Sequence, residues 1–293
     1  MNWWKNLKGK VKLNEPLCKH TSFRIGSAVR FFIEPADIEE LKLIVSYAKK
    51  QRLKLLVIGA GSNILAADKA SAAVVVRLSS GFFSKISCKS NYIEAGSGVA
   101  LARLVKVALG KQLSGVEFLA GIPGTVGGAL FMNAGGWGQN IGDLVAHVKV
   151  MDYNNKTLYL DKKDLRFGYR CADFSRYIIL GARLKLKRAS RQFIKKRLKE
   201  YIDYRRDTQD LHWPSAGCVF KNPKDHSAGR LIDACGLKGK SIGGAQVSER
   251  HANFILNRNN AKAGDVVKLM KFVEKKVKSK FNIKLEPEIK LWL

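Results

Sequence analysis

The sequence predicts an α+β fold, because strand-like and helix-like stretches are interspersed without a regular βα succession. We find no internal repeat. The composition, 46% hydrophobic and 26% charged, is that of a folded globular protein rather than a disordered one. The length of 293 residues fits one large domain or two to three small ones.

The first part of the chain combines helices with short buried strands. A helix is expected over residues 37–50, with Asp37 as its N-cap, Glu40 three residues later and one apolar stripe of Leu41, Ile44, Val45 and Ala48. Strands are expected at residues 53–59, 74–78 and 92–95. A second helix follows the third strand, with an apolar side and a late glycine: Leu101, Leu104, Val105, Ala108 and Gly110.

The second part begins with a strand pair, residues 147–152 and 157–160, around the turn Asn154-Asn155, and a further strand at 178–186. A basic helix near 190–204 has Ser190 as a possible cap and one apolar stripe: Ile194, Leu198, Tyr201 and Ile202. An amphipathic helix is marked by Val266, Met270, Val273, Val277 and Phe281, and a terminal strand closes the chain. The preferred domain boundary is the basic helix, and a weaker one lies near 79–84.

Membrane insertion, secretion and structural metal are not expected. The longest uncharged stretch, Phe118–Gly142, contains so many glycines that it reads as folded loop and turn. The N-terminus has no apolar core of signal-peptide length, so we expect the protein in the cytoplasm. The five cysteines form no CxxC pair, which predicts neither a disulfide framework nor a metal site.

The formal net charge of +29 first suggests a nucleic-acid partner. The excess is spread along the chain, however, and no aromatic motif for stacking on bases is present. We therefore expect no specific nucleic-acid binding, and the field of these charges would instead steer anionic small molecules.

Two glycine-rich stretches are candidates for ligand binding. GAGSNIL (59–65) follows a strand but lacks the sixth-position glycine of a dinucleotide fingerprint. It is either a plain tight turn or a loop whose amides, with Ser62 and Asn63, face a phosphate. GIPGTVGGALFMNAGG (121–136) is uncharged and dense in glycine, which favours close approach of backbone to a pyrophosphate and an aromatic ring.

The stretch SAGCVFKNP (215–223) places a thiol, Cys218, after two small residues. Buried cysteines usually behave as small hydrophobes, so this stretch alone leaves a filler and a reactive group both open.

Eight stretches occur in the order and spacing of one known family: TSFRIG, GAGSNIL, GVEFLAGIPGTVGGALFMNAGG, LRFGYR, SAGCVFKNP, HSAGRLID, GGAQVSERHANFILN and LEPEI. Over nearly its whole length the chain resembles the UDP-N-acetylenolpyruvoylglucosamine reductases, flavoproteins of peptidoglycan precursor synthesis. It is most similar to the shorter form of that family, because little chain separates LRFGYR from the basic helix.

The resemblance implies an FAD-binding fold of two subdomains, of the PCMH/vanillyl-alcohol-oxidase type, plus a C-terminal α+β substrate-binding subdomain. On this chain the parts would be residues 1–78 with the returning strand 283–293, residues 79–189, and residues 190–282 with the basic helix.

The resemblance also implies the reaction. NADPH reduces FAD, flavin N5 gives hydride to the enolpyruvyl ether of UDP-N-acetylglucosamine, and the product is UDP-N-acetylmuramate. The FAD-binding positions would be Gly59, Gly61, Ser62, Asn63, Gly124, Thr125, Gly128 and Asn133.

Three residues match the family's catalytic positions. Arg170 would stabilise charge on the substrate carboxylate as a planar, bidentate donor. Glu288 would stabilise the enolate or orient the donor, although Glu286 in the same motif could be confused with it. Cys218 stands where many members have serine, and it would deliver the proton. Cysteine suits this role because a free thiol, with a pKa of about 8.5, is far more acidic than an aliphatic hydroxyl.

The resemblance places four further residues at the nucleotide sugar: Tyr169, Lys221, Asn222 and His251. For His251 a structural role is equally open. Two other readings remain: a different flavoprotein of the same FAD fold, such as an oxidase, and a basic nucleic-acid-binding protein with a relic fold. The first is disfavoured by SAGCVFKNP and LEPEI, and the second predicts tight, salt-dependent binding to RNA or DNA.

Overall fold

The structure is a computed structural model that describes residues 3–292. The chain packs into two compact units. Unit 1 comprises Met1–Asn14, Arg30–Ala60 and Ala72–Asp203, and unit 2 comprises Glu15–Val29, Gly61–Ser71 and Tyr204–Leu293. The three-part division expected from the resemblance stays a prediction.

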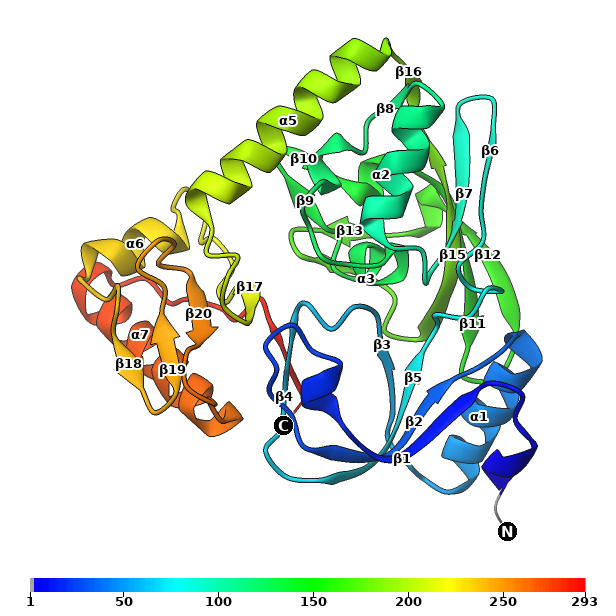
Figure 1. The fold of residues 1–293 in the computed structure, drawn as a ribbon, viewed down its shortest axis with the longest axis horizontal. Coiled ribbons are helices and arrows are strands. Elements are labelled where there is room, and N and C mark those ends of the chain that lie inside the picture. Colours follow the sequence, from blue (N-terminus) through cyan, green and yellow to red (C-terminus); the bar gives the residue numbers. More distant parts are fainter. Residues whose placement is uncertain (1–2, 293) are drawn as a thin grey trace. The chain divides into compact units, whose positions relative to one another are not determined.

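The centre of unit 1 is an antiparallel five-stranded sheet (Figure 1). Its strands, in spatial order, are β12 (Thr157–Asp161), β11 (Val145–Asp152), β15 (Tyr177–Lys185), β7 (Tyr92–Gly96) and β6 (Ile86–Lys89). The expected hairpin is confirmed, since Met151 pairs with Thr157 and Asn155 takes the left-handed conformation with φ 67°.

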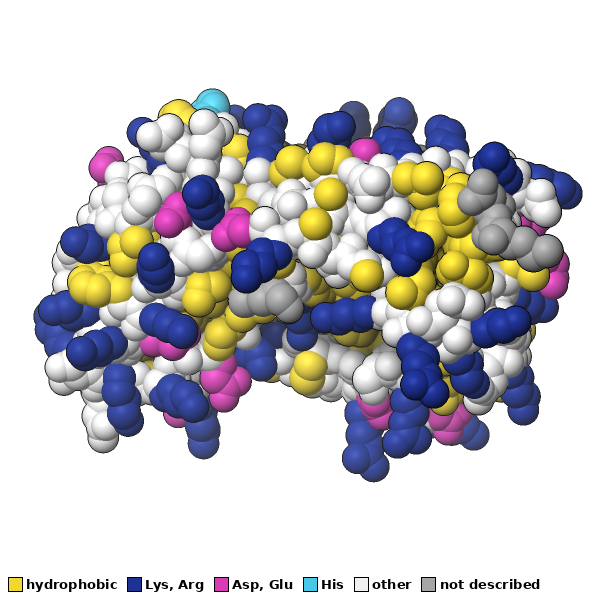
Figure 2. Space-filling view, turned by 90° about the horizontal axis from the view of Figure 1, so that it is seen from below, with side chains coloured by type: hydrophobic (Ala, Val, Ile, Leu, Met, Phe, Trp, Pro, Cys, Tyr) yellow, Lys and Arg dark blue, Asp and Glu magenta, His cyan; other side chains and the backbone are white. Residues whose placement is uncertain are grey.

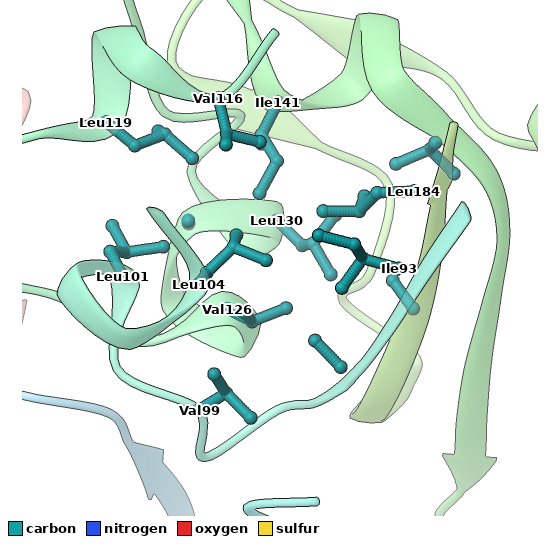
Figure 3. Close-up of a cluster of buried hydrophobic side chains, with 14 of the residues drawn as sticks. Ile93, Val99, Leu101, Leu104, Val116, Leu119, Val126, Leu130, Ile141 and Leu184 are labelled. Carbon is teal, nitrogen blue, oxygen red and sulfur yellow. The ribbon is translucent and has the colours of Figure 1, made fainter. Parts of the chain in front are cut away.

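Two helices, α2 (Leu101–Gly110) and α3 (Val126–Phe131), cover one face of this sheet. Figure 3 shows Leu101 and Leu104 of α2 with Val126 and Leu130 of α3, pointing toward the sheet residues Ile93 and Leu184. Burying a large aliphatic side chain contributes about 1.5–3 kcal/mol, so this cluster fixes α3 firmly. The sequence reading of 118–142 as loop and turn missed α3.

A second sheet of unit 1 has the order β1 (Lys10–Pro16), β2 (Ala28–Glu34), β5 (Ser71–Arg77) and β3 (Leu55–Ile58). Helix α1 (Ile38–Lys50) packs on it through the expected stripe, and Asp37 caps α1 by accepting from Glu40 N. Glu40 itself does not close a capping box. Its buried carboxylate accepts hydrogen bonds from the backbone N–H groups of Lys8, Gly9 and Ala36.

Further short elements lie outside these two sheets, and of these Leu17–Lys19 belongs to unit 2. They are the helix α4 (Ile141–Leu144), the 3₁₀ turns Trp3–Asn6, Leu17–Lys19, Glu117–Leu119 and Lys162–Asp164, and the strand pairs β8 (Leu113–Ser114) with β16 (Lys187–Arg188), β9 (Gly135–Gly136) with β10 (Gln139–Asn140), and β13 (Phe167–Gly168) with β14 (Cys171–Ala172).

The basic helix is α5 (Arg191–Thr208), and Ser190 Oγ accepts from Phe193 N as expected of a cap. Of the expected stripe, Ile194 and Tyr201 are buried, whereas Ile202 is 47% exposed. The apolar face is therefore narrower than the sequence suggested. Lys and Arg side chains are scattered over the face shown in Figure 2, with few carboxylates between them.

Unit 2 contains a sheet of order β17 (Ser215–Cys218), β20 (Phe254–Asn257), β19 (Ala245–Val247) and β18 (Ser241–Ile242). It is packed by α6 (Ala228–Ala234) and by α7 (Ala263–Phe281), whose expected stripe is buried except for the half-buried Phe281. The C-terminal strand β21 (Lys290–Trp292) pairs in parallel with β4 (Ile64–Ala66). Leu293 lies outside the described residues.

Among the described residues, no helix is long and apolar enough to cross a membrane. Within the part of the chain that the structure describes, none of the five cysteines forms a disulfide bond. No cluster of His, Cys, Asp and Glu suited to a metal ion occurs within residues 3–292.

Candidate functional site

The structure brings the two glycine-rich stretches together in unit 1. A Cβ added at Gly59 would lie 2.7 Å from Thr125 Oγ1, so the contact requires glycine. Thr125 also caps α3, with its Oγ1 accepting from Gly128 N at 3.4 Å. The exposed Gly128 and the half-buried Gly124 leave backbone of this turn open to a ligand.

Ser97 lies against the same turn and was missed by the sequence analysis. A Cβ at Gly127 would lie 2.9 Å from Ser97 Cβ, and Gly127 N donates to Ser97 O at 2.8 Å. Ser97 is 4% exposed, and its Oγ has no hydrogen-bond partner among the described residues. A buried hydroxyl without a partner is costly unless a ligand satisfies it. The signal in the sequence is the small-residue turn 96–98 directly after a strand.

Asn133 connects the glycine-rich stretch to the hairpin that carries Tyr169 and Arg170. Its side-chain oxygen accepts from Gly142 N at 3.0 Å, and its nitrogen donates to Gly168 O at 2.9 Å. The side chain is buried, so these bonds serve the protein itself. Direct contact of Asn133 with a cofactor stays a prediction, while its place beside the Arg170 hairpin is an observation.

Arg170 occupies the two-residue loop between β13 and β14 with φ 56°, a conformation that usually selects glycine or asparagine. An arginine kept there at a conformational cost points to a role for its side chain. Its Nη1 donates to Gly135 O at 2.9 Å, and its guanidinium lies 5.6 Å from the ring centroid of the exposed Tyr169. The guanidinium is thus held beside the backbone of the glycine-rich stretch.

Three of the predicted FAD-binding positions belong to unit 2: Gly61, Ser62 and Asn63. Gly61 has φ 68°, and a Cβ there would lie 2.0 Å from His20 O, so only glycine fits. Asn63 Nδ2 donates to Glu288 O at 3.2 Å, and Lys290 N donates to Asn63 O at 2.9 Å. The loop 61–63, with the half-buried Ser62, is thereby fixed to the segment that carries Glu288.

Cys218 follows a β-bulge in β17. Ser215 pairs with Leu256 and Cys218 with Phe254, so three steps on β17 match two on β20. Gly217 takes up the extra residue with φ 73°. Bulges change the direction in which a side chain points and are common beside active sites. The half-buried Cys218 is therefore placed by a local irregularity, unlike the fully buried Ala216 and Val219.

The chain after Cys218 lies between two other segments of unit 2. Glu288 N donates to Val219 O at 2.7 Å, and Lys221 N donates to Glu286 O at 2.9 Å. On the other side, Val219 N donates to Asn253 O at 2.8 Å. Main-chain hydrogen bonds thus connect the segment that carries Cys218 to the segment that carries Glu288.

The two glutamates of LEPEI differ in surroundings. Glu286 is exposed and pairs with Lys221 at 3.3 Å, whereas Glu288 is half-buried. A carboxyl in an exposed ion pair is a weak candidate for chemistry, which favours Glu288. The ammonium of Lys221, expected near a pyrophosphate, is paired with Glu286 in this structure.

Asn222 and His251 also belong to unit 2. Asn222 is exposed, and its Oδ1 accepts from Ala228 N at 3.0 Å at the start of α6. His251 is half-buried, its Nδ1 has no partner among the described residues, and its ring lies 4.6 Å from that of Phe254. Burial, and to a smaller extent Lys238, lowers the pKa of His251. A neutral imidazole is therefore favoured.

The residues of unit 1 fit a flavin dinucleotide by their chemistry. The turn at 124–128 is uncharged, presents exposed backbone and lies against a buried hydroxyl without a partner. Unit 2 supplies a thiol, a carboxyl, a lysine and an amide on one pair of adjoining segments. Such a set can bind a polar anionic substrate and transfer a proton to it.

Comparisons with known proteins match two separate parts of this chain. A family model described as FAD binding domain matches residues 29–161, and one described as UDP-N-acetylenolpyruvoylglucosamine reductase, C-terminal domain, matches residues 209–292. The expected α+β, FAD-binding fold is confirmed. The match over 209–292 counts against the alternative of an unrelated oxidase on the same fold.

Relatives named UDP-N-acetylenolpyruvoylglucosamine reductase are 41% identical over 286 residues in Caldanaerobacter subterraneus subsp. tengcongensis and 38% identical over 287 residues in Bacillus pumilus. Each alignment covers 97% of this chain and 94% of the relative. The crystal structure of the reductase from Thermus caldophilus superposes with a TM-score of 0.83 at 34% identity, covering 98% of this chain and 100% of that one. This chain belongs to the UDP-N-acetylenolpyruvoylglucosamine reductase family.

Proposed function

We propose that this protein reduces the enolpyruvyl ether of UDP-N-acetylglucosamine to UDP-N-acetylmuramate, with FAD as cofactor and NADPH as reductant. The observation that carries the proposal is the arrangement in unit 2, where the segments of Cys218 and Glu288 are hydrogen-bonded to each other within the region that matches the family's C-terminal domain. We place the reaction in the cytoplasm and include no specific nucleic-acid partner.

FAD, when bound, passes a hydride from NADPH to the terminal carbon of the substrate's double bond. The residues that would hold it are the predicted glycine-loop positions, to which we add Ser97 because its buried hydroxyl has no partner among the described residues. Backbone amides and hydroxyls suit this task, because they bind a pyrophosphate and polar ring atoms without adding charge.

Arg170 acts on the substrate carboxylate in this proposal. When hydride adds to the terminal carbon, negative charge develops on the neighbouring carbon and its carboxylate. A guanidinium stabilises that charge with two parallel hydrogen bonds, and its anchorage on Gly135 O keeps it oriented before the reaction.

Cys218 delivers the proton that completes the addition. The S–H bond breaks, a C–H bond forms at the carbon next to the carboxylate, and the thiolate takes up a proton from solvent. Glu288, on the adjoining segment, stabilises the enolate or orients the donor. Tyr169, Lys221, Asn222 and His251 would contact the nucleotide sugar, for which Lys221 must exchange its exposed partner Glu286 for a phosphate.

The experiment that tests the proposal follows the visible spectrum of the purified protein without oxygen. NADPH should bleach the flavin band, and addition of the enolpyruvyl sugar nucleotide should restore it. A protein that bleaches and stays reduced would retain the flavin fold but contradict the substrate. Faster reoxidation by oxygen than by the sugar nucleotide would instead favour an oxidase.

A further inference from the structure

We propose that Asn253 is a positioning residue for Cys218 and Glu288, an inference that rests on the function proposed above. Asn253 directly precedes strand β20 and is 3% exposed. Its carboxamide binds only main-chain atoms of Phe220 in the described contacts: Oδ1 accepts from Phe220 N at 3.0 Å, and Nδ2 donates to Phe220 O at 2.8 Å.

The two hydrogen bonds from the Asn253 carboxamide take the place of those that a neighbouring strand would make to Phe220. Regular pairing of β17 with β20 ends where Cys218 faces Phe254. Beyond that point the main chain of Asn253 accepts from Val219 N, and its side chain then binds both polar groups of Phe220. One planar amide supplies a donor and an acceptor at the spacing of a peptide group, as a strand would.

The opposite edge of the same segment binds the segment 286–288. Val219 O accepts from Glu288 N, and Phe220 forms an isolated antiparallel bridge with Pro287. The segment 219–221 therefore lies between Asn253 and the segment 286–288. Any displacement of Phe220 moves its neighbour Val219, which directly follows Cys218 and also accepts the hydrogen bond from Glu288 N.

The bulge in β17 explains why Phe220 needs the two hydrogen bonds from Asn253. Between Ser215 and Cys218 the register shifts, so the ladder with β20 is interrupted directly before the thiol. Without the carboxamide, two buried main-chain groups of Phe220 would lose their partners, and the chain would relax toward water or other groups. A small misplacement of a reacting group can cost about 100-fold in rate.

Asn253→Ala and Asn253→Asp test the inference, with Asn257→Ala as the matched control. Asn257 ends the same strand, and its carboxamide also bridges two main-chain groups, accepting from Ala261 N at 2.8 Å and donating to Phe23 O at 3.1 Å. It makes no described contact with residues 218–222. Folding of each protein is checked by its melting temperature, and both half-reactions are measured by stopped flow at saturating NADPH and substrate.

Asn253→Ala should slow reoxidation of the flavin by the enolpyruvyl sugar nucleotide about 10- to 100-fold. Its reduction by NADPH should change less than about twofold, because that step needs neither the thiol nor Glu288. Asn257→Ala should leave the rates of both half-reactions within about twofold of wild type, even if its melting temperature falls as much as that of Asn253→Ala. Equal slowing in both variants, or an unchanged reoxidation rate in folded Asn253→Ala, would overturn the inference.

Asn253→Asp tests the same contacts with Phe220 through a pH dependence, and it serves if Asn253→Ala does not fold. When protonated, the new carboxyl donates to Phe220 O and accepts from Phe220 N, whereas the carboxylate cannot donate. The ratio of its reoxidation rate to that of wild type should therefore fall as pH rises, and a ratio independent of pH would contradict the proposal. A wild type whose reduced flavin does not react with the sugar nucleotide overturns the proposed function itself, and the inference with it.

Discussion

The turn at 124–128 in unit 1 and the segment 215–221 in unit 2 are both rich in small residues, yet they use them differently. In unit 1 the small residues allow backbone to pack closely, as where Gly59 meets Thr125. In unit 2 a single glycine, Gly217, permits a bulge that sets the direction of one side chain. The turn at 124–128 should therefore be sensitive to added volume, and the segment 215–221 to the loss of particular atoms.

The largest effect is expected at the thiol. Cys218→Ala should slow reoxidation of the flavin by the sugar nucleotide about 10²- to 10⁴-fold, because a general acid is lost. NADPH should still bleach the flavin at the wild-type rate, and Cys218→Ser should retain turnover. Cys88→Ala in β6 is the control thiol and should behave as wild type. Normal reoxidation by the alanine variant would assign Cys218 to packing instead.

Arg170 belongs to unit 1, but its proposed role depends on the chemistry of its side chain and not on close packing of the backbone. Arg170→Lys should lower the reoxidation rate about 10²- to 10³-fold, because an ammonium cannot make the bidentate contact. The substitution also keeps the positive charge, so a rate near wild type would show that charge alone suffices. Stopped-flow absorbance at saturating substrate separates the two results.

Added volume should act through folding and cofactor retention wherever the backbone packs closely, including at Gly61 of unit 2. Gly61→Ala places a methyl 2.0 Å from His20 O at φ 68°, so we expect a loss of stability of about 1–3 kcal/mol and a lower flavin content. Gly138→Ala is matched in backbone, with φ 74°, but has nothing within 4 Å of the new Cβ. Chemical denaturation measures the stability of both variants, and the flavin-to-protein absorbance ratio measures their flavin content. Equal losses in both variants would mean that backbone strain at positive φ, and not the contact of the methyl group with His20 O, causes the loss.

The smallest effect is expected from His251. Burial lowers the pKa of His251 below its ordinary value of 6.5, so the unfolded chain binds a proton more readily than the folded one. Its contribution to stability is complete above pH 6.5 and is lost as pH falls from 6.5 through the folded pKa. Wild type should therefore lose more stability than His251→Gln between neutral pH and about pH 5. Parallel denaturation curves for the two proteins across this range would contradict the assignment.

The elements whose causes are local could be predicted from the amino-acid sequence alone. Asp37 accepts a hydrogen bond within its own helix turn, the hairpin turns at Asn154-Asn155, and the stripe of α7 repeats every three or four residues. The ordered motifs also determined the family and the candidate residues, because their spacing along the chain is itself a sequence property. None of these features depends on a distant partner.

How the candidate residues are held depends on contacts between distant segments and could not be predicted from the sequence. Helix α3 forms within a glycine-rich stretch because its apolar residues pack on the five-stranded sheet, against the low helix propensity of glycine. Asn253 binds Phe220, and Glu288 binds Val219, across many intervening residues, so no local pattern reveals either contact. The physical reason is that hydrogen bonds between distant segments depend on the register of their main chains, which is set by packing rather than by neighbouring residues.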